Sequence, residues 1–492
     1  MSSLLHPERG AATQVQGDSH SPAPGSSLLL WGIAIVGALL RLIALGRKSF
    51  WLDEIASVAI ARRPWPVFWH FLWHDEGNMA LYYVTLKPWL HFGYGEGTVR
   101  LLSVVAGVLS IPLMYVLGAR LLGREAGILA SVLLALNTCA VAVSQEARAY
   151  SFLVLFVLLS SYLFVRLMEA RSYPAALAYA AVAGVTCYVH YFGVLVPAAH
   201  AVSVLSLSAN RRSWRLPIIA WAIIAVLAAP VLWLIHAQDV GHISWLQPPS
   251  WLELYHLGVF LAADGGKAVG AALLVLELAL AAGFGLALLR AWRGRNDDWS
   301  RWHYSLIASM VFTPVAISLV VSIVRPAFYH RFLIVCLPGW LLMLAAGVLQ
   351  LRSRAWRMGA IAAVCALSLA ATTLFYARQT EDWRGAVAYL MANTRPDDRV
   401  FYYQSVGQFA GESYRDWLQP SNAACPQTFG ISTPNGDWER DLDRADRLWL
   451  VVYRAKAHEA EALTIQQELS KRYEPGPSKV FHGVTVIEYN HK

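Results

Sequence analysis

The stretch that decides the fold is SLLLWGIAIVGALLRLIALGRKSFWLDE, residues 27–54. Ser27 to Leu45 is an apolar run long enough for a membrane-spanning helix, because roughly 20 residues cross the hydrocarbon core of a bilayer. The run is too long for the apolar core of a signal peptide and has no small-residue cleavage site, so we expect a retained first span. Two acidic residues, Asp53 and Glu54, follow just beyond its outer end.

The composition of the 492-residue chain also indicates a membrane protein. Apolar residues make up 57% and charged residues only 15%, and the mean hydropathy is +0.44. So few polar residues cannot cover a water-soluble globule of this size, which excludes the soluble and disordered classes. The net charge of +8 lies in short clusters between apolar runs. That pattern is typical of membrane topology and argues against a nucleic-acid partner.

Eleven apolar stretches are candidate spanning helices. They lie at residues 27–46, 99–119, 126–143, 152–167, 174–188, 193–208, 216–236, 268–289, 303–324, 332–349 and 357–376. A further stretch, Met79 to Phe92, contains Lys87-Pro88 and is too short to span, so we expect it on the membrane surface. Residues 1–26, rich in Ser, Pro, Gly and Ala, are expected to form a disordered cytoplasmic tail.

The distribution of arginine orients these spans. Five loops on one side, residues 120–125, 166–172, 209–215, 290–301 and 350–357, hold 14 arginines in 40 residues, whereas the segments on the other side hold 10 Lys or Arg in 104. Positive residues are enriched on the cytoplasmic side of membrane proteins. We therefore expect a cytoplasmic N-terminus and a first external loop over residues 47–98.

After Arg378 the composition becomes polar. Helix-like and strand-like patterns alternate over Trp383–Thr394, Val400–Tyr403, Leu448–Tyr453, His458–Tyr473 and Val480–Tyr489. The alternation predicts a small extracytoplasmic α/β domain over residues 379–492, next to a transmembrane domain over residues 27–378. Acceptor stacking and core packing both explain the aromatic residues of this domain, which are Trp383, Tyr402, Tyr403, Trp417 and Trp438.

The first external loop places its acids near an anchored segment. The residues after Asp53 and Glu54 are compatible with a helix, so Asp53 lies near a helix N-terminus, where a carboxylate is stabilised and oriented. Trp65, Trp69 and Trp73 recur every four residues and would form one aromatic face in the membrane interface. The acids would then lie at the level of a lipid headgroup.

A second polar group, SQEARAYS at residues 144–151, is expected on the same side, between the third and fourth spans. Alone, it is a short loop with an internal pair of Glu146 and Arg148. Together with Asp53 it favours one shared site, because both acidic loops would open on the same face of the bundle. Tyr150 lies in the same loop.

Three further positions add polar groups to this face. His190 lies in a turn at residues 188–191, and Tyr329 and Arg331 lie in a turn at residues 325–331. The planar guanidinium of Arg331 suits phosphate oxygens. Arg41 lies inside the outer end of the first span, where a charge is costly without a partner, so we expect it to face a cavity and not lipid.

Five features follow one another along the chain: the span with Arg41, the WLDE motif at 51–54, NMALYYVTLKPW at 78–89, SQEARAYSF at 144–152 and YHRF at 329–332. Together they resemble the pattern of bacterial membrane glycosyltransferases of the GT-C fold. The pattern is most similar to the family 39 and protein O-mannosyltransferase-like group, which includes the aminoarabinose transferases of lipid A, and to its YSQEAR branch. The resemblance covers roughly residues 27 to 380. The chain departs from it at Asn78-Met79-Ala80, where many relatives have NPP or KPP.

This resemblance implies an all-α polytopic membrane protein of the GT-C fold, with about 11 transmembrane helices, interfacial helices in the first loop and the α/β domain. It implies an inverting transfer from a polyprenyl-phosphate sugar donor to a glycan, lipid or protein acceptor, on the periplasmic side of the bacterial inner membrane. Asp53 would be the catalytic base, and Glu54 and Glu146 would be further catalytic acids that position the acceptor. The substrate-binding residues would be Arg41, Arg148, Tyr150, His190, Tyr329 and Arg331.

Two points stay open on the sequence. No cofactor is expected, although a divalent metal is not excluded because some relatives use one. The alternative function is a transporter or flippase of lipid-linked sugars without catalysis, and a silent membrane scaffold is a third. A transporter needs charged groups near the bilayer midplane and paired halves, and the sequence has no internal repeat of fixed period.

Overall fold

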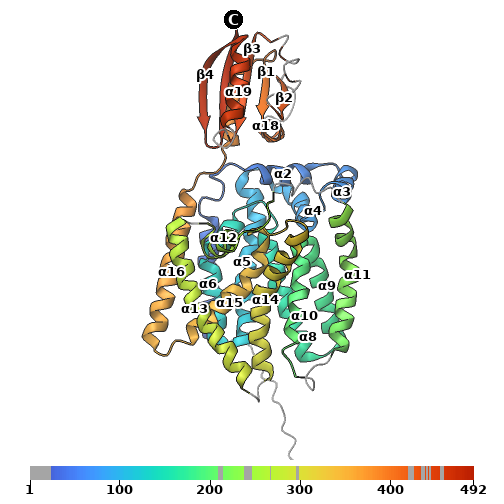
Figure 1. The fold of residues 1–492 in the computed structure, drawn as a ribbon, viewed down its shortest axis with the longest axis vertical. Coiled ribbons are helices and arrows are strands. Elements are labelled where there is room, and N and C mark those ends of the chain that lie inside the picture. Colours follow the sequence, from blue (N-terminus) through green and yellow to red (C-terminus); the bar gives the residue numbers. More distant parts are fainter. Residues whose placement is uncertain are drawn as a thin grey trace, which may run out of the picture.

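A bundle of membrane helices carries an α/β domain at one end (Figure 1). The computed structural model describes residues 24–208, 214–237, 246–265, 267–294, 298–418, 426–433, 438, 442, 445–454 and 459–492. The tail expected over residues 1–26 lies outside the described residues except for its last three, which form the start of helix α1.

The long helices of the bundle are the apolar runs of the sequence. They are α1 (Pro24–Leu42), α5 (Glu96–Leu122), α6 (Arg124–Leu136), α7 (Thr138–Ser144), α8 (Tyr150–Ala170), α9 (Tyr173–Val189), α10 (Leu195–Val204), α11 (Arg215–Ala237), α13 (Lys267–Arg293), α14 (Asp298–Val324), α15 (Leu337–Leu349) and α16 (Arg354–Ala377). Each of the eleven predicted stretches falls on these helices. Within the described residues, seven spans are long and apolar enough to cross a membrane, or eight if α6 and α7 form one bent span. The chain is a multi-pass membrane protein, and the count of eleven spans stays a prediction.

The bend between α6 and α7 brings the second polar loop to its position. The two helices meet at 55°, because Asn137 ends α6 and caps α7 by accepting a hydrogen bond from the Ala140 amide (2.9 Å). Its Nδ2 donates to the Leu261 carbonyl at the end of α12 (Trp251–Ala263) (2.9 Å). The stretch predicted as a span over residues 126–143 therefore consists of two helices, because an internal asparagine satisfies a new helix N-terminus, and the span itself stays a prediction.

The segment over residues 47–98, which we expect to be the first external loop, folds into short helices across the end of the bundle (Figure 1). These are α2 (Leu52–Arg62), α3 (Trp65–His74), α4 (Ala80–Trp89) and the 3₁₀ turn η1 (Leu90–Phe92). Asp53 lies in the first turn of α2, and Trp65, Trp69 and Trp73 are all exposed on α3. Exposed tryptophans suit a membrane interface, where the ring has apolar surroundings and the N–H meets water.

The turn with Arg331 leads into the centre of the bundle. Two further 3₁₀ turns are η2 (Tyr191–Val194) and η4 (Phe332–Cys336). Residues of η4 and α15 are almost all buried between their neighbours. Arg331 immediately precedes η4, so a rigid, fully packed segment fixes the base of this side chain.

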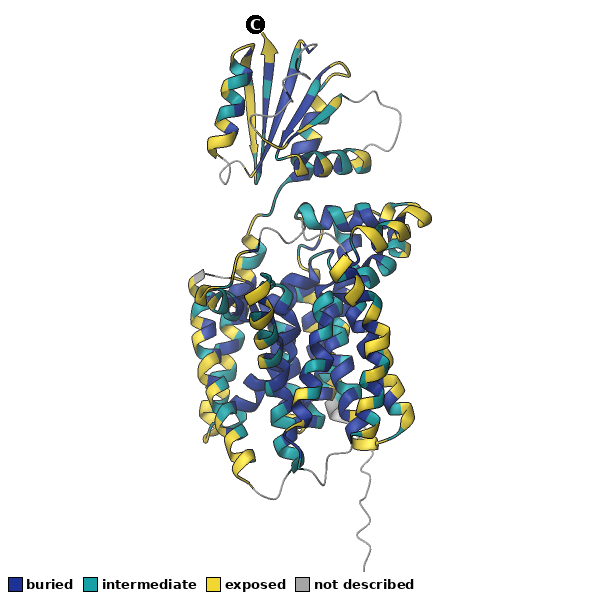
Figure 2. Ribbon diagram, turned by 45° about the vertical axis from the view of Figure 1, so that its right-hand side comes forward, coloured by how far each residue is buried: buried dark blue, intermediate teal, exposed yellow. Residues whose placement is uncertain are grey.

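The C-terminal domain has a mixed five-stranded sheet of order β2-β1-β3-β5-β4. Its elements are α17 (Trp383–Asn393), β1 (Arg399–Tyr403), α18 (Val406–Leu418), β2 (Gln427–Ile431), β3 (Arg447–Tyr453), α19 (Glu459–Ser470), β4 (Tyr473–Phe481) and β5 (Val484–His491). Strands β1, β2 and β3 are parallel, and β5 pairs antiparallel with β3 and β4. The central strands are buried on both faces (Figure 2), as expected for parallel strands covered by helices.

The α/β prediction for this domain is confirmed, with three differences, of which the first is that strand β2 was not predicted. The strand expected over Val480–Tyr489 is a hairpin, because Gly483 (φ +75°) forms the turn between β4 and β5. Helix α18 was missed because its sequence is polar and contains glycine. At Gly411 a Cβ would lie 2.4 Å from the Tyr402 hydroxyl, so glycine allows the helix to pack on β1.

Candidate active site

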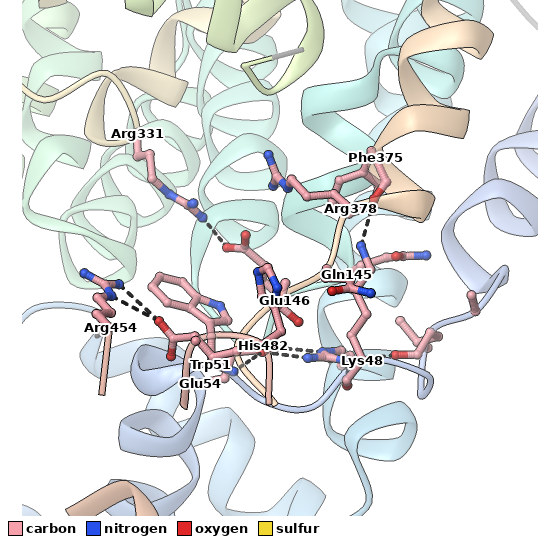
Figure 3. A pocket seen from close by; sticks show the side chains of 17 residues that line it. Lys48, Trp51, Glu54, Gln145, Glu146, Arg331, Phe375, Arg378, Arg454 and His482 are labelled. Atoms are coloured by element: carbon pink, nitrogen blue, oxygen red, sulfur yellow. Dashed lines mark hydrogen bonds and ion pairs between the residues drawn. The ribbon is translucent and has the colours of Figure 1, made fainter. Parts of the chain in front are cut away.

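A cavity of about 360 Å³ lies where the two acidic loops, the Arg331 turn, the end of α16 and the C-terminal domain meet (Figure 3). Five cationic side chains and three carboxylates line it. The cations are Lys48, Arg100, Arg331, Arg378 and Arg454, and the acids are Glu54, Glu146 and Glu381. The surplus of positive charge favours an anionic ligand.

Glu54 is fully buried and joins the two acidic loops. It forms a bidentate ion pair with Arg100 of α5, with both N–O distances at 2.7 Å. Its Oε1 also accepts from the Ala147 amide of the second loop (2.8 Å), and its Oε2 accepts from the Trp51 amide (3.3 Å). Four hydrogen bonds occupy this carboxylate, so its geometry fits a residue that holds the site together better than one that contacts the acceptor.

Asp53 precedes the cavity-lining Glu54 but does not itself line the cavity, and it is more accessible than Glu54. Its side chain is 40% exposed and pairs with Arg148 of the second loop at 3.6 Å. The side chain of Arg148 is buried, which by itself would lower the pKa of its guanidinium. Asp53, together with Tyr83, Tyr150 and Glu76, raises this pKa. A long, single contact leaves the Asp53 carboxylate with oxygen lone pairs for a hydroxyl proton.

Glu146 and Arg331 form a second pair between the loops (Figure 3). The Arg331 guanidinium also lies near the rings of Trp51 (5.4 Å) and Tyr150 (5.2 Å). Within the described part of the chain, the Nε atoms of Arg331 and Arg148 are buried without a hydrogen-bond partner. Such donors are costly unless a ligand oxygen accepts from them.

Two predicted residues, Arg41 and His190, do not line this cavity. Arg41 is fully buried and donates to Ser144 Oγ (3.1 Å) and to three main-chain carbonyls of α1 and α6, so it binds the interior of the bundle and does not line the cavity. His190 is buried against Tyr150 and Phe332. Burial, with Arg148 nearby, lowers the pKa of His190 to about 3, so the imidazole is neutral at pH 7.

A second cavity, of about 460 Å³, adjoins the first and shares Arg331 and Arg378 with it. Tyr329 lies in its wall together with Asp264, which follows α12. Burial raises the pKa of Asp264 to about 6, although its ion pair with Arg378 (2.8 Å) opposes this shift. Arg331 and Arg378 therefore line both cavities, the first next to the acidic loops and the second next to α12.

Several residues of this site carry no recognisable signal in the sequence. Lys48, Arg378, Asp264 and Glu381 lie in segments without a motif, and only the packing of distant elements brings them to the cavities. Arg100 lies at the start of the predicted apolar stretch 99–119, and the motifs predict no role for it. An arginine at the outer start of an apolar span is the signal that points to a buried partner.

Within the described residues, no group of three or more His, Cys, Asp or Glu side chains could hold a metal ion. The three carboxylates that line the cavity, Glu54, Glu146 and Glu381, each pair with an arginine.

Comparisons with known proteins agree with this architecture. A model of the dolichyl-phosphate-mannose-protein mannosyltransferase family matches residues 79–236. No curated protein sequence matches the chain. The structure is similar to ArnT from Cupriavidus metallidurans bound to undecaprenyl phosphate, with a TM-score of 0.58 and 13% identity over 95% of this chain and 98% of ArnT.

An archaeal enzyme shares the same arrangement. The structure is similar to the Archaeoglobus fulgidus oligosaccharyltransferase in complex with Zn and sulfate, with a TM-score of 0.57 and 12% identity over 94% of this chain and 73% of that one. For the same enzyme, AglB, with an inhibitory peptide and a dolichol-phosphate, the TM-score is 0.53 and the identity 10%, over 96% and 75% of the two chains. The family model and these likenesses together show that the chain has the GT-C fold.

Proposed function

We propose that this protein is an inverting glycosyltransferase that moves a sugar from a polyprenyl-phosphate donor to a glycan, lipid or protein acceptor. One observation carries the proposal. Two acidic loops far apart in the chain meet beside one cavity with surplus positive charge, where Asp53 pairs with Arg148 and Glu146 pairs with Arg331. An anionic donor with a sugar needs cations for its phosphate and a base for the acceptor.

In the proposed reaction, the Asp53 carboxylate accepts the proton of the acceptor hydroxyl. The acceptor oxygen forms a bond to the anomeric carbon as the bond from that carbon to the phosphate oxygen breaks. The bonding electrons leave with the phosphate, and displacement from the opposite face inverts the anomeric configuration. Arg331 stabilises the charge that develops on the leaving phosphate. The Nε atoms of Arg331 and Arg148, which have no hydrogen-bond partner within the described residues, donate hydrogen bonds to the phosphate oxygens in this proposal.

The other predicted residues receive supporting roles in this proposal. Glu146 orients Arg331, whereas Glu54 and Arg41 hold the two loops in place. Tyr150, Tyr329 and His190 supply aromatic walls around Arg331. We also propose that the transmembrane domain covers residues 27–378 and the C-terminal domain residues 379–492. In this proposal the N-terminus is cytoplasmic and the C-terminal domain is periplasmic, an orientation that the arginines of the loops support.

A turnover assay tests this function. The purified protein is incubated with labelled polyprenyl-phosphate sugars and an extract of bacterial envelope acceptors. We expect release of polyprenyl phosphate, together with a product of opposite anomeric configuration. Movement of the intact donor across a vesicle membrane, without cleavage, would instead support the flippase alternative.

Lys48 gives a pH-dependent prediction. Burial, together with Arg378 and Arg100, lowers the pKa of Lys48 to about 8, and the side chain lines the first cavity. If its ammonium binds the donor phosphate, donor binding is strong below pH 8 and weakens as the proton is lost above it. A hydrogen bond from a charged group corresponds to about tenfold in affinity, so we expect the donor KM to rise by about tenfold from pH 7 to pH 9.5.

The Lys48→Arg variant is the matched control for this prediction, because a guanidinium keeps its charge over this range. Its donor KM should change little between pH 7 and pH 9.5. Parallel pH profiles for Lys48→Arg and the wild-type protein would show that Lys48 does not bind the phosphate.

A further inference from the structure

The C-terminal domain holds the segment that carries Asp53. We infer that Glu381 is a positioning residue, which fixes the main chain directly before Asp53 and so sets the direction of that carboxylate. The inference rests on the proposed function for its catalytic consequence, whereas the contact itself is independent of any substrate.

Glu381 reaches across the boundary between the two domains. Its Oε2 accepts from the Leu52 amide (3.3 Å), and Leu52 is the residue before Asp53. Within the C-terminal domain, Glu381 accepts from the Tyr453 hydroxyl (2.6 Å), Trp383 Nε1 (3.2 Å) and Arg454 Nη2 (3.1 Å). The side chain is only 12% exposed. The domain therefore holds this carboxylate firmly and presents one oxygen to the loop.

The contact falls on the N-terminus of α2. Leu52 is the first residue of α2, and its N–H has no partner inside the helix. A carboxylate at this end is favourable because the helix dipole is positive there. The preceding Trp51 amide donates to the Glu54 side chain of the same helix. The Trp51 amide is therefore satisfied within α2, whereas the Leu52 amide is satisfied by Glu381 of the C-terminal domain. Docking of the C-terminal domain thus sets the direction of α2.

A second contact, from Tyr414 on α18, holds the same segment. The Tyr414 hydroxyl accepts from the Phe50 amide (2.6 Å) and from Ser49 Oγ (3.0 Å), and it donates to Glu96 Oε1 (3.0 Å). Arg384 also pairs with Glu96 at 3.1 Å. Four consecutive residues, 49–52, therefore lie between the C-terminal domain and α5.

This clamp has a catalytic consequence because Asp53 has only a weak anchor of its own. Its ion pair with Arg148 is long, at 3.6 Å, so the direction of its carboxylate depends on the main chain before it. A displacement of about 1 Å at a reacting group can cost on the order of 10²-fold in rate. Loss of the clamp should therefore lower kcat and leave the donor KM nearly unchanged.

The test uses the full-length protein with Glu381→Ala and Glu381→Gln. We expect kcat to fall by on the order of 10²-fold in the alanine variant, with an intermediate loss in the glutamine variant because its amide oxygen can still accept one bond. Glu488→Gln is the matched control. Glu488 is also a shielded acid that pairs with an arginine, Arg447 at 3.5 Å, but on the far strand β5. Its kcat should equal that of the wild-type protein.

Amide hydrogen exchange of residues 49–54, measured without substrate, separates the clamp from the proposed function. We expect faster exchange in Glu381→Ala, and also in Tyr414→Phe, which keeps the ring and removes only the hydroxyl. Unchanged exchange in both variants would overturn the inference, as would an unchanged kcat in a folded Glu381→Ala protein. If the wild-type protein transfers no sugar, the proposed function fails, and the exchange result still decides whether the clamp exists.

Discussion

Asp53→Asn is expected to lower kcat for sugar transfer by about 10²- to 10⁴-fold, the range that a positioned general base contributes. The amide has nearly the same shape as the carboxylate but cannot accept the acceptor proton. Its fold should survive, because the Asp53 side chain is 40% exposed and its ion pair with Arg148 is long, at 3.6 Å, while the hydrogen bonds that Arg148 and Ser57 donate to the Asp53 main-chain carbonyl do not depend on the side chain. Single-turnover release of polyprenyl phosphate from a labelled donor measures the effect, and donor binding should stay within about twofold of the wild type.

The control for this variant is Asp416→Asn. Asp416 is also an exposed acid, 63% accessible, with an arginine partner at 3.2 Å, but it lies on α18. This variant should keep full activity. If Asp53→Asn also transfers sugar at the wild-type rate when expression is normal, Asp53 is not the base.

Glu54→Gln is expected to destabilise the protein by about 3–5 kcal/mol, because it removes one partner of a buried ion pair. The Arg100 guanidinium is 5% exposed and would lose its compensating charge. The Ala147 amide would lose a charged acceptor as well. The two acidic loops would then separate, so activity should fall together with stability. The measurement is the unfolding midpoint of the purified protein in detergent, followed by tryptophan fluorescence.

The surface pair of Glu169 and Arg120 is the matched control for Glu54. Its atoms lie at a similar distance, 2.8 Å, but both side chains are about one third exposed, and exposed pairs contribute about 0–1 kcal/mol. Glu169→Gln should therefore have little effect on the unfolding midpoint. A double variant, Glu54→Gln with Arg100→Met, should recover part of the lost stability because no unpaired charge remains. Equal effects of Glu54→Gln and Glu169→Gln would contradict the role assigned to Glu54.

The membrane part of the fold was predictable because apolar length and arginine clusters are local signals. The eleven apolar stretches, the helix start near Asp53 and the α/β domain could be recognised in this way. The bend at Asn137 could not be predicted from the sequence. An asparagine inside an apolar run marks a helix N-terminus only where the surrounding chain supplies partners for its side chain, and here that partner is the Leu261 carbonyl.

The candidate site was predictable where two motifs carry it. Asp53, Glu146, Arg148 and Arg331 were singled out, and the structure brings them together, while their roles stay proposals. The adjacent acids Asp53 and Glu54 look equivalent in the sequence, but their surroundings differ. Glu54 is buried against Arg100, whereas the Asp53 side chain is 40% exposed.

The C-terminal domain shows the limit of sequence reasoning most clearly. Of its five aromatic residues considered for acceptor stacking, Trp383, Tyr402, Tyr403 and Trp438 are buried in the domain core. The fifth, Trp417, packs on Phe50 of the first loop. Glu381 and Arg454, two of the residues of this domain that line the cavity, belong to no motif. Only the docking of the two domains identifies them.

The location of a bound polyprenyl phosphate tests the central claim most directly. An electron cryo-microscopy structure of the full-length protein in lipid nanodiscs with undecaprenyl phosphate provides it. We predict phosphate density in the 360 Å³ cavity, about 3 Å from donors of Arg331 or Lys48. Phosphate bound only elsewhere, such as at the opposite end of the bundle or in the apolar groove between α1 and α6, would contradict the account.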